Sequence, residues 1–182
     1  MHKQWGQSIK LLDHRLELFL AHYRKKSIVI DHLLIVVARY GPAMFFVEMF
    51  LLILFASSLS TTRNHAILAV IIAVLAAITT KLTVDPIAHR INRVRPFVRY
   101  QYEPLVAKAA FDPSFPSNHA GGALALATVL IYQFPDVSGL TLGLALLILV
   151  SRVYSGLHYL TDLVAGGLVG IVVAMFYLWL IG

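Results

Sequence analysis

Hydrophobic residues lie in long blocks along most of this chain, and short polar stretches separate the blocks. Between Phe115 and Ser151 the only charged side chain is Asp136, and after Arg152 the only one is Asp162. Segments of this kind cannot build a water-soluble surface, and a helix needs about 20 apolar residues to cross a bilayer. The pattern therefore predicts an all-α, polytopic membrane helix bundle. Five transmembrane helices are expected, at residues 43–58, 66–85, 117–132, 140–153 and 163–181.

The first 40 residues follow a different pattern. Residues 5–24 repeat apolar side chains at helical spacing with charged residues between them, which is typical of an amphipathic helix at a membrane surface. Residues 28–40 are apolar but too short for a span, so an interfacial helix is expected there, ended by Gly41-Pro42. The chain thus divides into N-terminal amphipathic and interfacial helices at 1–40 and a transmembrane bundle at 41–182. A sixth span through 28–40 stays open.

Composition and charge narrow the class of partner. The hydrophobic fraction of 59% and the mean hydropathy of +0.78 exceed the values of soluble domains, which are about 45–50% apolar. The net charge of +6 favours contact with anionic lipid headgroups or an anionic substrate. No nucleic-acid-binding motif accompanies it, so nucleic acid is not expected as a partner. The chain has no cysteine, which excludes disulfides and cysteine metal sites.

Counting the crossings brings two loops together. A long basic connection, residues 86–116, enters the third predicted span, and a short one, residues 155–161, follows the fourth. Because two successive spans return the chain to its starting face, both loops are expected on the same side of the membrane. That face then collects guanidinium, hydroxyl, amide, imidazole and carboxylate groups, from Arg90, Arg93, Arg95, Arg99, Ser117, Asn118, His119, Arg152, His158 and Asp162.

This mixture of groups suits a phosphate ester. One guanidinium group can donate two hydrogen bonds to a phosphate, and the free N–H groups at a helix start add further donors. Ser117 stands where such a helix begins, after Pro116. His158 and Asp162 are four residues apart and share a helix face if the last helix begins near His158. The carboxylate is then expected to accept a hydrogen bond from one imidazole nitrogen, which leaves the other free as a nucleophile or base.

Three motifs carry a family resemblance. PSNH at 116–119 resembles the P-S-x-H motif of the type 2 phosphatidic acid phosphatase superfamily, which includes the vanadium haloperoxidases. SRVYSGLHYLTD at 151–162 fits that family's S-R-x5-H-x3-D motif, and Arg95-Pro96 resembles the end of its K-x6-R-P motif. The order and spacing of the motifs also match, and the resemblance covers roughly residues 28–181.

The resemblance implies a role for each residue. His158 would be the nucleophile that forms a phosphohistidine, Asp162 would orient it, and His119 would serve as general acid and then base. Arg95, Ser117, Asn118 and Arg152 would hold the phosphate oxygens. No cofactor or metal is expected, because the arginines supply the positive charge. A zinc site built from the two histidines and Asp162 is the alternative interpretation.

One position departs from the family pattern. The lysine of the first motif would fall at Ala88, and Lys81, seven residues earlier, is expected to lie too deep to replace it. Absence of this lysine resembles the bacterial undecaprenyl-diphosphate phosphatases. The expected substrate is therefore undecaprenyl diphosphate, with phosphatidic acid or phosphatidylglycerol phosphate as alternatives. A small membrane transporter is the alternative from another class, and the oligomeric state stays open.

Orientation gives two conflicting expectations. With five spans the N-terminus lies on the side of the active site, where its basic residues favour the cytoplasm by the positive-inside rule. The family resemblance implies a bacterial cytoplasmic (inner) membrane with the active site facing the periplasm or exterior. Because phosphate-binding arginines are present for chemistry, they bias the charge count, and the outward orientation is the one expected here.

Overall fold

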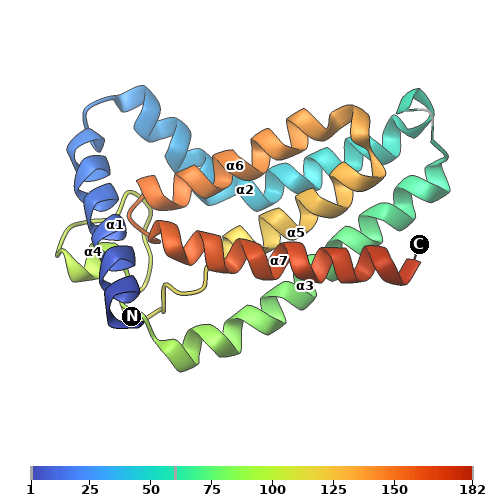
Figure 1. Cartoon of the computed structure of the whole chain (residues 1–182). Coiled ribbons are helices and arrows are strands. Elements are labelled where there is room, and N and C mark those ends of the chain that lie inside the picture. Colours follow the sequence, from blue (N-terminus) through green and yellow to red (C-terminus); the bar gives the residue numbers. More distant parts are fainter. Residues whose placement is uncertain (1, 60, 182) are drawn as a thin grey trace.

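The computed structural model describes residues 2–59 and 61–181, and within these residues all regular structure is helical (Figure 1). The predicted all-α class is confirmed. The elements in chain order are α1 (His2–Tyr23), α2 (Ile28–Leu54), the 3-10 helix η1 (Ala56–Leu59), α3 (Arg63–Ile91), α4 (Pro96–Arg99), α5 (Asn118–Gln133), the 3-10 helix η2 (Pro135–Val137), α6 (Ser138–Tyr154) and α7 (Leu160–Ile181).

Five helices run along the bundle, and α1 lies across one of its ends (Figure 1). This end, called the loop end below, holds α1, α4 and the connections 92–117 and 155–159, whereas the C-terminus lies at the opposite end. The two connections meet there directly, because Ser117 N donates to Asp162 O at 3.0 Å and Leu105 N donates to Ser155 O at 3.3 Å. The predicted meeting of the two loops on one side is confirmed.

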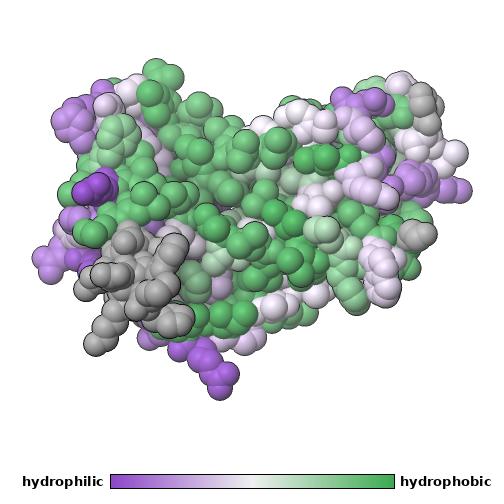
Figure 2. Space-filling model, viewed as in Figure 1, coloured by the Kyte–Doolittle hydropathy of each residue, from purple (hydrophilic) through white to green (hydrophobic). Residues whose placement is uncertain are grey.

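The lengths and surfaces of these helices are those of a multi-pass membrane protein. Four stretches are long and apolar enough to cross a bilayer, at residues 28–54, 63–99, 135–154 and 160–181. Figure 2 shows hydrophobic residues over the middle of the face in view and hydrophilic residues toward its two ends. The fifth bundle helix, α5, has only 16 residues and packs against α2, α3, α6 and α7, so its neighbours shield it from lipid.

The predicted helix break at Gly41-Pro42 is wrong. Helix α2 begins after Ser27, whose hydroxyl caps Ile30 N, and continues through Pro42 for 27 residues. Gly41 allows close packing there, since an added Cβ would lie 2.7 Å from Cγ1 of Ile148 in α6. Proline is tolerated inside membrane helices because neighbouring helices and local adjustments satisfy the freed backbone groups. Residues 28–40 are therefore the first half of one span and form neither an interfacial helix nor a separate sixth span.

Glycines set the distance between α5 and its neighbours. A Cβ at Gly166 would lie 2.2 Å from Ser117 O, and one at Gly170 would lie 2.1 Å from Gly121 O. This close approach brings the start of α7 against the start of α5. Gly121 packs on Thr80 and Gly166, whereas an added Cβ at the adjacent Gly122 would meet nothing within 4 Å.

Helix α1 is amphipathic as predicted, but its buried face is not purely apolar. Leu16 and Leu20 pack against Val153 and Leu163. Asp13 and Glu17 lie on the same face and are each only 3% exposed. Since a buried carboxylate is costly unless it is paired, α1 is held to the loop end by specific polar contacts as well as by apolar packing.

Candidate active site

Arg95 fastens the long loop to the short one. Its guanidinium donates to the carbonyl oxygens of Asp112 at 3.0 Å, Pro113 at 2.9 Å and Leu157 at 2.8 Å. NH1 of Arg95, which donates to Leu157, also lies 3.2 Å from Nε2 of His158. Because Arg95 is only 5% exposed, this cation is fixed beside the imidazole before any substrate enters.

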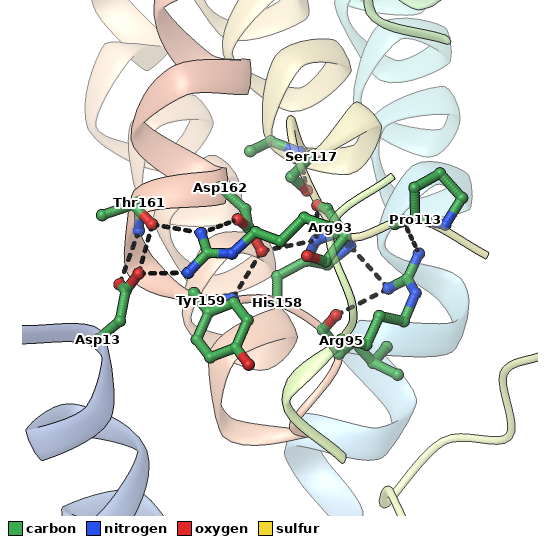
Figure 3. A network of polar contacts seen from close by, with 12 residues as sticks. Asp13, Arg93, Arg95, Pro113, Ser117, His158, Tyr159, Thr161 and Asp162 are labelled. Atoms are coloured by element: carbon green, nitrogen blue, oxygen red, sulfur yellow. Dashed lines mark hydrogen bonds and ion pairs between the residues drawn. The ribbon is translucent and has the colours of Figure 1, made fainter. Parts of the chain in front are cut away.

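The imidazole of His158 is held through its other nitrogen. Nδ1 lies 2.8 Å from the carbonyl oxygen of Ser114 and 3.7 Å from Oδ2 of Asp162. A carbonyl can only accept, so Nδ1 carries the proton and the lone pair lies on Nε2. The expected direct hydrogen bond from His158 to Asp162 is thus replaced by one to the Ser114 carbonyl. The Asp162 carboxylate still lies near the imidazole (Figure 3).

The carboxylate of Asp162 is buried and fully engaged. Oδ2 accepts from the backbone N–H of Tyr159 at 2.8 Å, which closes the first turn of α7. Oδ1 accepts from NH1 of Arg93 at 2.6 Å. The carboxylate therefore fixes the short loop that carries His158 and also pairs with a cation from the long loop.

Arg152 is the cation without a protein partner for its inner nitrogen. It lies in the last turn of α6, is 5% exposed, and its Nε has no hydrogen-bond partner within the described part of the chain. A buried, unsatisfied guanidinium nitrogen is costly, and a bound anion would remove that cost. Arg152 lies near the end of α6 and His119 lies in the first turn of α5, so both lie at the loop end with Arg95 and His158.

The start of α5 also lies at this end. The Ser117 hydroxyl accepts from Ala120 N at 3.4 Å as an ordinary helix cap, and Ser117 N is used by Asp162 O. The N–H groups of Asn118 and His119 belong to the first turn, where a helix supplies no internal acceptor. The Asn118 side chain donates to Asp85, so its backbone N–H, rather than its amide, is the group available to a phosphate.

An apolar cavity of about 330 Å³ opens beside His119. Its walls come mainly from α2, α3 and α5, and they are formed by Phe45, Phe46, Met49, Val74, Ile78 and Leu126 among others. Gly122 lines it, as do Asn118, His119 and Lys81. The side chain of Lys81 also pairs with Asp85; that Lys81 lies too deep to replace the first-motif lysine stays a prediction.

Burial sets the electrostatics of the two loops. It lowers the pKa of His158, Arg95 adds to this shift, and Asp162 and the Ser114 carbonyl oppose it. The ring is therefore neutral at neutral pH. Burial also lowers the pKa of Arg95, partly offset by Asp112 and Asp162, although a guanidinium stays cationic in a protein. For Arg93 burial acts in the same direction, but pairing with Asp13 and Asp162 raises its pKa overall.

The family model described as the PAP2 superfamily matches residues 64–182, which is more than half of the chain. The chain belongs to the PAP2 superfamily. The match includes every motif on which the resemblance rested, from Arg95-Pro96 to Asp162.

Two curated relatives of this PAP2 protein support its resemblance to the BcrC group. The "Bacitracin transport permease protein BcrC" of Bacillus licheniformis is 32% identical over 120 residues, or 65% of this chain and 58% of that protein. The "Undecaprenyl-diphosphatase BcrC" of Bacillus subtilis (strain 168) is 26% identical over 158 residues, or 87% of this chain and 77% of the relative. The chain thus spans less than two thirds of the first relative.

Solved structures share the fold. A PAP2-type phosphatidylglycerolphosphate phosphatase from Bacillus subtilis superposes with a TM-score of 0.69 at 20% identity, covering 95% of this chain and 86% of its own. LpxE of Aquifex aeolicus gives 0.61 at 24% identity, covering 90% and 94%. A bacterial vanadium-dependent iodoperoxidase gives 0.68 at 16% identity, covering 96% of this chain and 48% of its own.

All seven residues predicted for the site lie at the loop end of this PAP2 protein, at the start of α5, the end of α6, the start of α7 and the two connecting loops. Three contributors went unrecognised in the sequence: the Ser114 carbonyl, the Arg93 guanidinium as partner of Asp162, and Asp13 of α1. Only Asp13 had a local signal, since it shares one helix face with Leu16, Glu17 and Leu20. Among residues 2–59 and 61–181, no three His, Asp or Glu side chains form a group that could hold a metal ion.

Proposed function

We propose that this chain is an integral-membrane lipid phosphatase that removes the terminal phosphate of undecaprenyl diphosphate through a phosphohistidine intermediate. The observation that carries the proposal is the buried Arg152, whose Nε has no partner within the described residues and which lies at the loop end that also holds Arg95, His119 and His158. An anion with several oxygens satisfies such a site, and the apolar cavity beside His119 suits the lipid attached to it.

In the first step Nε2 of His158 attacks the terminal phosphorus. The bond from that phosphorus to the bridging oxygen breaks, and lipid monophosphate leaves with its oxygen protonated by His119. Arg152, Arg95 and the N–H groups at the start of α5 would hold the equatorial oxygens and balance the developing charge. Because phosphoryl transfer depends mainly on positioning and charge stabilisation, these donors supply most of the catalysis.

The second step restores the enzyme. His119, now neutral, takes a proton from water as the water attacks the phosphohistidine. The phosphorus–nitrogen bond breaks, inorganic phosphate leaves, and the electron pair returns to Nε2. Proton transfer of this kind contributes about 10²–10⁴-fold. Asp162 would stabilise the positive charge on His158 while the intermediate exists.

Lys81 favours a diphosphate over a monophosphate substrate. It lines the same cavity as His119 and Asn118, on the side of the apolar walls. With the terminal phosphate between the arginines and the lipid in the cavity, the inner phosphate would lie near Lys81. Phosphatidic acid and phosphatidylglycerol phosphate stay the alternative substrates, and the fold shared with a phosphatidylglycerolphosphate phosphatase leaves them to be tested.

A transporter is the candidate from another class, and one relative carries the name of a transport permease. A transporter would not require a neutral imidazole with its lone pair on Nε2 beside the buried Arg95. Phosphate release from farnesyl diphosphate by the purified protein in detergent separates the two functions. We expect His158→Ala to abolish release and His65→Ala, a histidine at the opposite end, to leave it unchanged.

The intermediate gives a sharper test of the same proposal. Substrate labelled with ³²P in the terminal phosphate should leave an acid-labile, base-stable label on the wild-type protein and none on His158→Ala. Persistent phosphate release by the purified His158→Ala protein would rule out the covalent mechanism. A wild-type protein that released no phosphate from diphosphate or monophosphate lipids would rule out the enzyme.

We also propose an inner-membrane location with the loop end facing outward. Several cations of that end already have partners in the fold: Arg24 pairs with Glu17, Arg93 with two carboxylates, and Lys108 with Asp112. They serve the fold and site, so their number is a biased guide to topology. Because the chain has no cysteine, Ala107→Cys should react with an impermeant thiol reagent in cells with a permeable outer layer. Asn64→Cys, at the opposite end, should react only after lysis; the reverse pattern contradicts the proposal.

A further inference from the structure

Arg93 connects helix α1 to Asp162, the carboxylate next to the proposed nucleophile His158. NH2 of Arg93 donates to Oδ2 of Asp13 at 2.7 Å, while its NH1 donates to Oδ1 of Asp162 at 2.6 Å. A single guanidinium thus bridges a carboxylate of the N-terminal helix and a carboxylate of α7 (Figure 3). The planar fork of arginine suits such a bridge, whereas lysine offers one point charge.

Thr161 closes the bridge from the other side. Its hydroxyl accepts from NH1 of Arg93 at 2.7 Å and donates to Oδ2 of Asp13 at 2.6 Å. Its backbone N–H donates to Oδ1 of Asp13 at 3.2 Å. Asp13 therefore caps the first turn of α7 next to Asp162, and both of its oxygens are engaged although it belongs to a helix 148 residues away in sequence.

Arg93 also acts on the second group that holds His158. Its carbonyl accepts from the backbone N–H of Ser114 at 2.8 Å, and the Ser114 carbonyl accepts from Nδ1 of His158. The guanidinium is further restrained over the ring of Tyr159, 3.9 Å from its centroid. Both partners of the Nδ1 side of His158, Ser114 and Asp162, thus depend on the placement of Arg93.

We propose that Asp13 and Arg93 are positioning residues that couple the docking of α1 to the alignment of His158. The inference rests on the proposed function and adds the N-terminal helix to the same site. Neither residue lines the cavity beside His119, so each acts through Asp162 and Ser114 and not on the substrate. The proposed coupling therefore involves helix α1, which lies outside the family match because that match begins at residue 64.

The two residues should move the titration of His158 in opposite directions. The charged and titratable groups around this ring come from the long loop, α5, α6 and α7, and they are Arg93 behind Asp162, Arg95, His119, Arg152 and Asp162 itself. Removing the positive charge of Arg93 favours protonated His158, so the acid limb of kcat/KM moves to higher pH. Removing the negative charge of Asp13 disfavours it, so the limb moves to lower pH.

A buried carboxylate on the same helix provides a matched control. Glu17 is as buried as Asp13 and holds α1 through Arg24 and Tyr102, and neither contact reaches Asp162. Glu17→Gln therefore neutralises an equally buried carboxylate of α1 and leaves the bridge from Asp13 through Arg93 to Asp162 in place. We expect Asp13→Asn to lower kcat for farnesyl diphosphate by about tenfold to a hundredfold, as is typical of groups that orient a catalytic ligand, with KM nearly unchanged.

Conservative variants separate positioning from folding. Arg93→Met should shift the acid limb upward, whereas Arg93→Lys should keep the limb near its wild-type position but lower kcat, because a lysine cannot bridge two carboxylates. Thr161→Val should resemble Asp13→Asn, and Thr161→Ser should restore the wild-type rate. Equal losses of kcat in Asp13→Asn and Glu17→Gln, with the acid limb unmoved in both, would reduce α1 to a structural cover and overturn the proposal.

A readout without substrate keeps this inference separate from the proposed function. In protein labelled with ¹⁵N-histidine, the signal of His158 can be assigned by its loss in His158→Gln and then titrated in detergent. Its apparent pKa should fall in Asp13→Asn, rise in Arg93→Met and stay in Glu17→Gln. An inactive wild-type protein with these shifts would reject the phosphatase but keep the coupling. An active wild-type protein without these shifts would keep the phosphatase and reject the coupling.

Discussion

The two sides of His119 differ in composition: one is polar and the other is mainly apolar. On one side the cradle formed by Arg95, Arg152, His158 and the start of α5 is polar; hydrogen bonds hold Arg95 and His158, whereas Nε of Arg152 has no partner within the described residues. On the other side the walls of the cavity of about 330 Å³ are mainly apolar. In the proposed function the cradle would bind the phosphate through individual donors, whereas the cavity would accept the lipid through the space that Gly122 and its neighbours leave.

This difference predicts unequal tolerance to substitution. A polar cradle loses function when one donor is removed, because the remaining groups were positioned for an anion that is no longer fully bound. An apolar cavity changes gradually, because each methylene group contributes only about 0.8 kcal/mol. The predictions below test this inequality, beginning with the largest effect.

Arg152→Gln should cause the largest loss. It keeps much of the side-chain volume but removes the buried cation, so kcat/KM for farnesyl diphosphate should fall by about 10²–10³-fold, as for other donors to a developing charge. Phosphate release across a substrate series measures it. Arg39→Gln, an exposed arginine on α2, is the control and should have little effect. A variant that kept a third of the wild-type kcat/KM would remove Arg152 from the cradle.

Lys81→Met should distinguish diphosphate from monophosphate substrates. Because Asp85 already pairs with this lysine, part of its charge is compensated, and we expect kcat/KM for farnesyl diphosphate to fall by about tenfold, equivalent to about 1.4 kcal/mol. The value for farnesyl phosphate should stay the same, since that substrate has no inner phosphate. Equal losses on both substrates would place Lys81 elsewhere in the reaction and leave the diphosphate preference unsupported.

Gly122→Leu should affect the lipid side alone. Nothing lies within 4 Å of an added Cβ at Gly122, so the larger side chain can occupy the cavity without disturbing the helices. We expect KM to rise by about fivefold for a long polyprenyl diphosphate, near the size of one lost apolar contact, and kcat to change little. A short soluble diphosphate should show no change, and an equal rise for it would mean that the cavity does not hold the lipid.

The neighbouring glycine provides the matched contrast. An added Cβ at Gly121 would lie 2.8 Å from Thr80 Cγ2 and 3.0 Å from Gly166 O. Gly121→Ala should therefore lower the free energy of unfolding by about 1–3 kcal/mol, the usual cost of overpacking, whereas Gly122→Ala should not. Thermal unfolding in detergent compares the two. Equal stabilities would contradict the division of these two glycines between packing and cavity.

The smallest effect concerns pH. Burial and Arg95 lower the pKa of His158, so this imidazole, the proposed nucleophile, stays neutral to a pH below the ordinary histidine pKa of about 6.5. The acid limb of kcat/KM that reports this group should therefore lie below about pH 6.5. Profiles for wild type and Glu17→Gln should coincide. An acid limb above pH 7 that Arg93→Met left unmoved would assign the limiting ionisation to another group.

Much of this site was predictable because it depends on local spacing and on crossing parity. Two returning spans suffice to bring Arg95, His119 and His158 to one end. The sequence does not determine which acceptor Nδ1 of His158 uses, because Ser114 O at 2.8 Å and Asp162 Oδ2 at 3.7 Å both lie near it and tertiary packing sets the two distances. The sequence also could not assign a partner to Arg93, because its partners Asp13 and Asp162 lie far from it along the chain and other carboxylates could pair with it equally well.

Two errors have physical causes of the same kind. Gly41-Pro42 predicts a break in water, yet the packing of α2 against Ile148 allows the helix to continue. The charged residues of the N-terminal helix are expected between its apolar positions, yet Asp13 and Glu17 lie on the buried face, where Arg93 and Arg24 compensate their charge. In both cases tertiary contacts override a local preference, and a single sequence does not contain those contacts.

The 16 residues of α5 have a consequence for the lipid itself. At 1.5 Å per residue this helix is about 24 Å long, and the hydrocarbon core of a bilayer is about 30 Å thick. With the shortfall at its N-terminal end, this terminus and the histidine beside it would lie below the level of the headgroups. The headgroup of an incoming lipid would then sink a few ångströms along the protein, while its chain stayed in the hydrocarbon layer. Hydrolysis would then need no extraction of the lipid, only a local dip of its polar head.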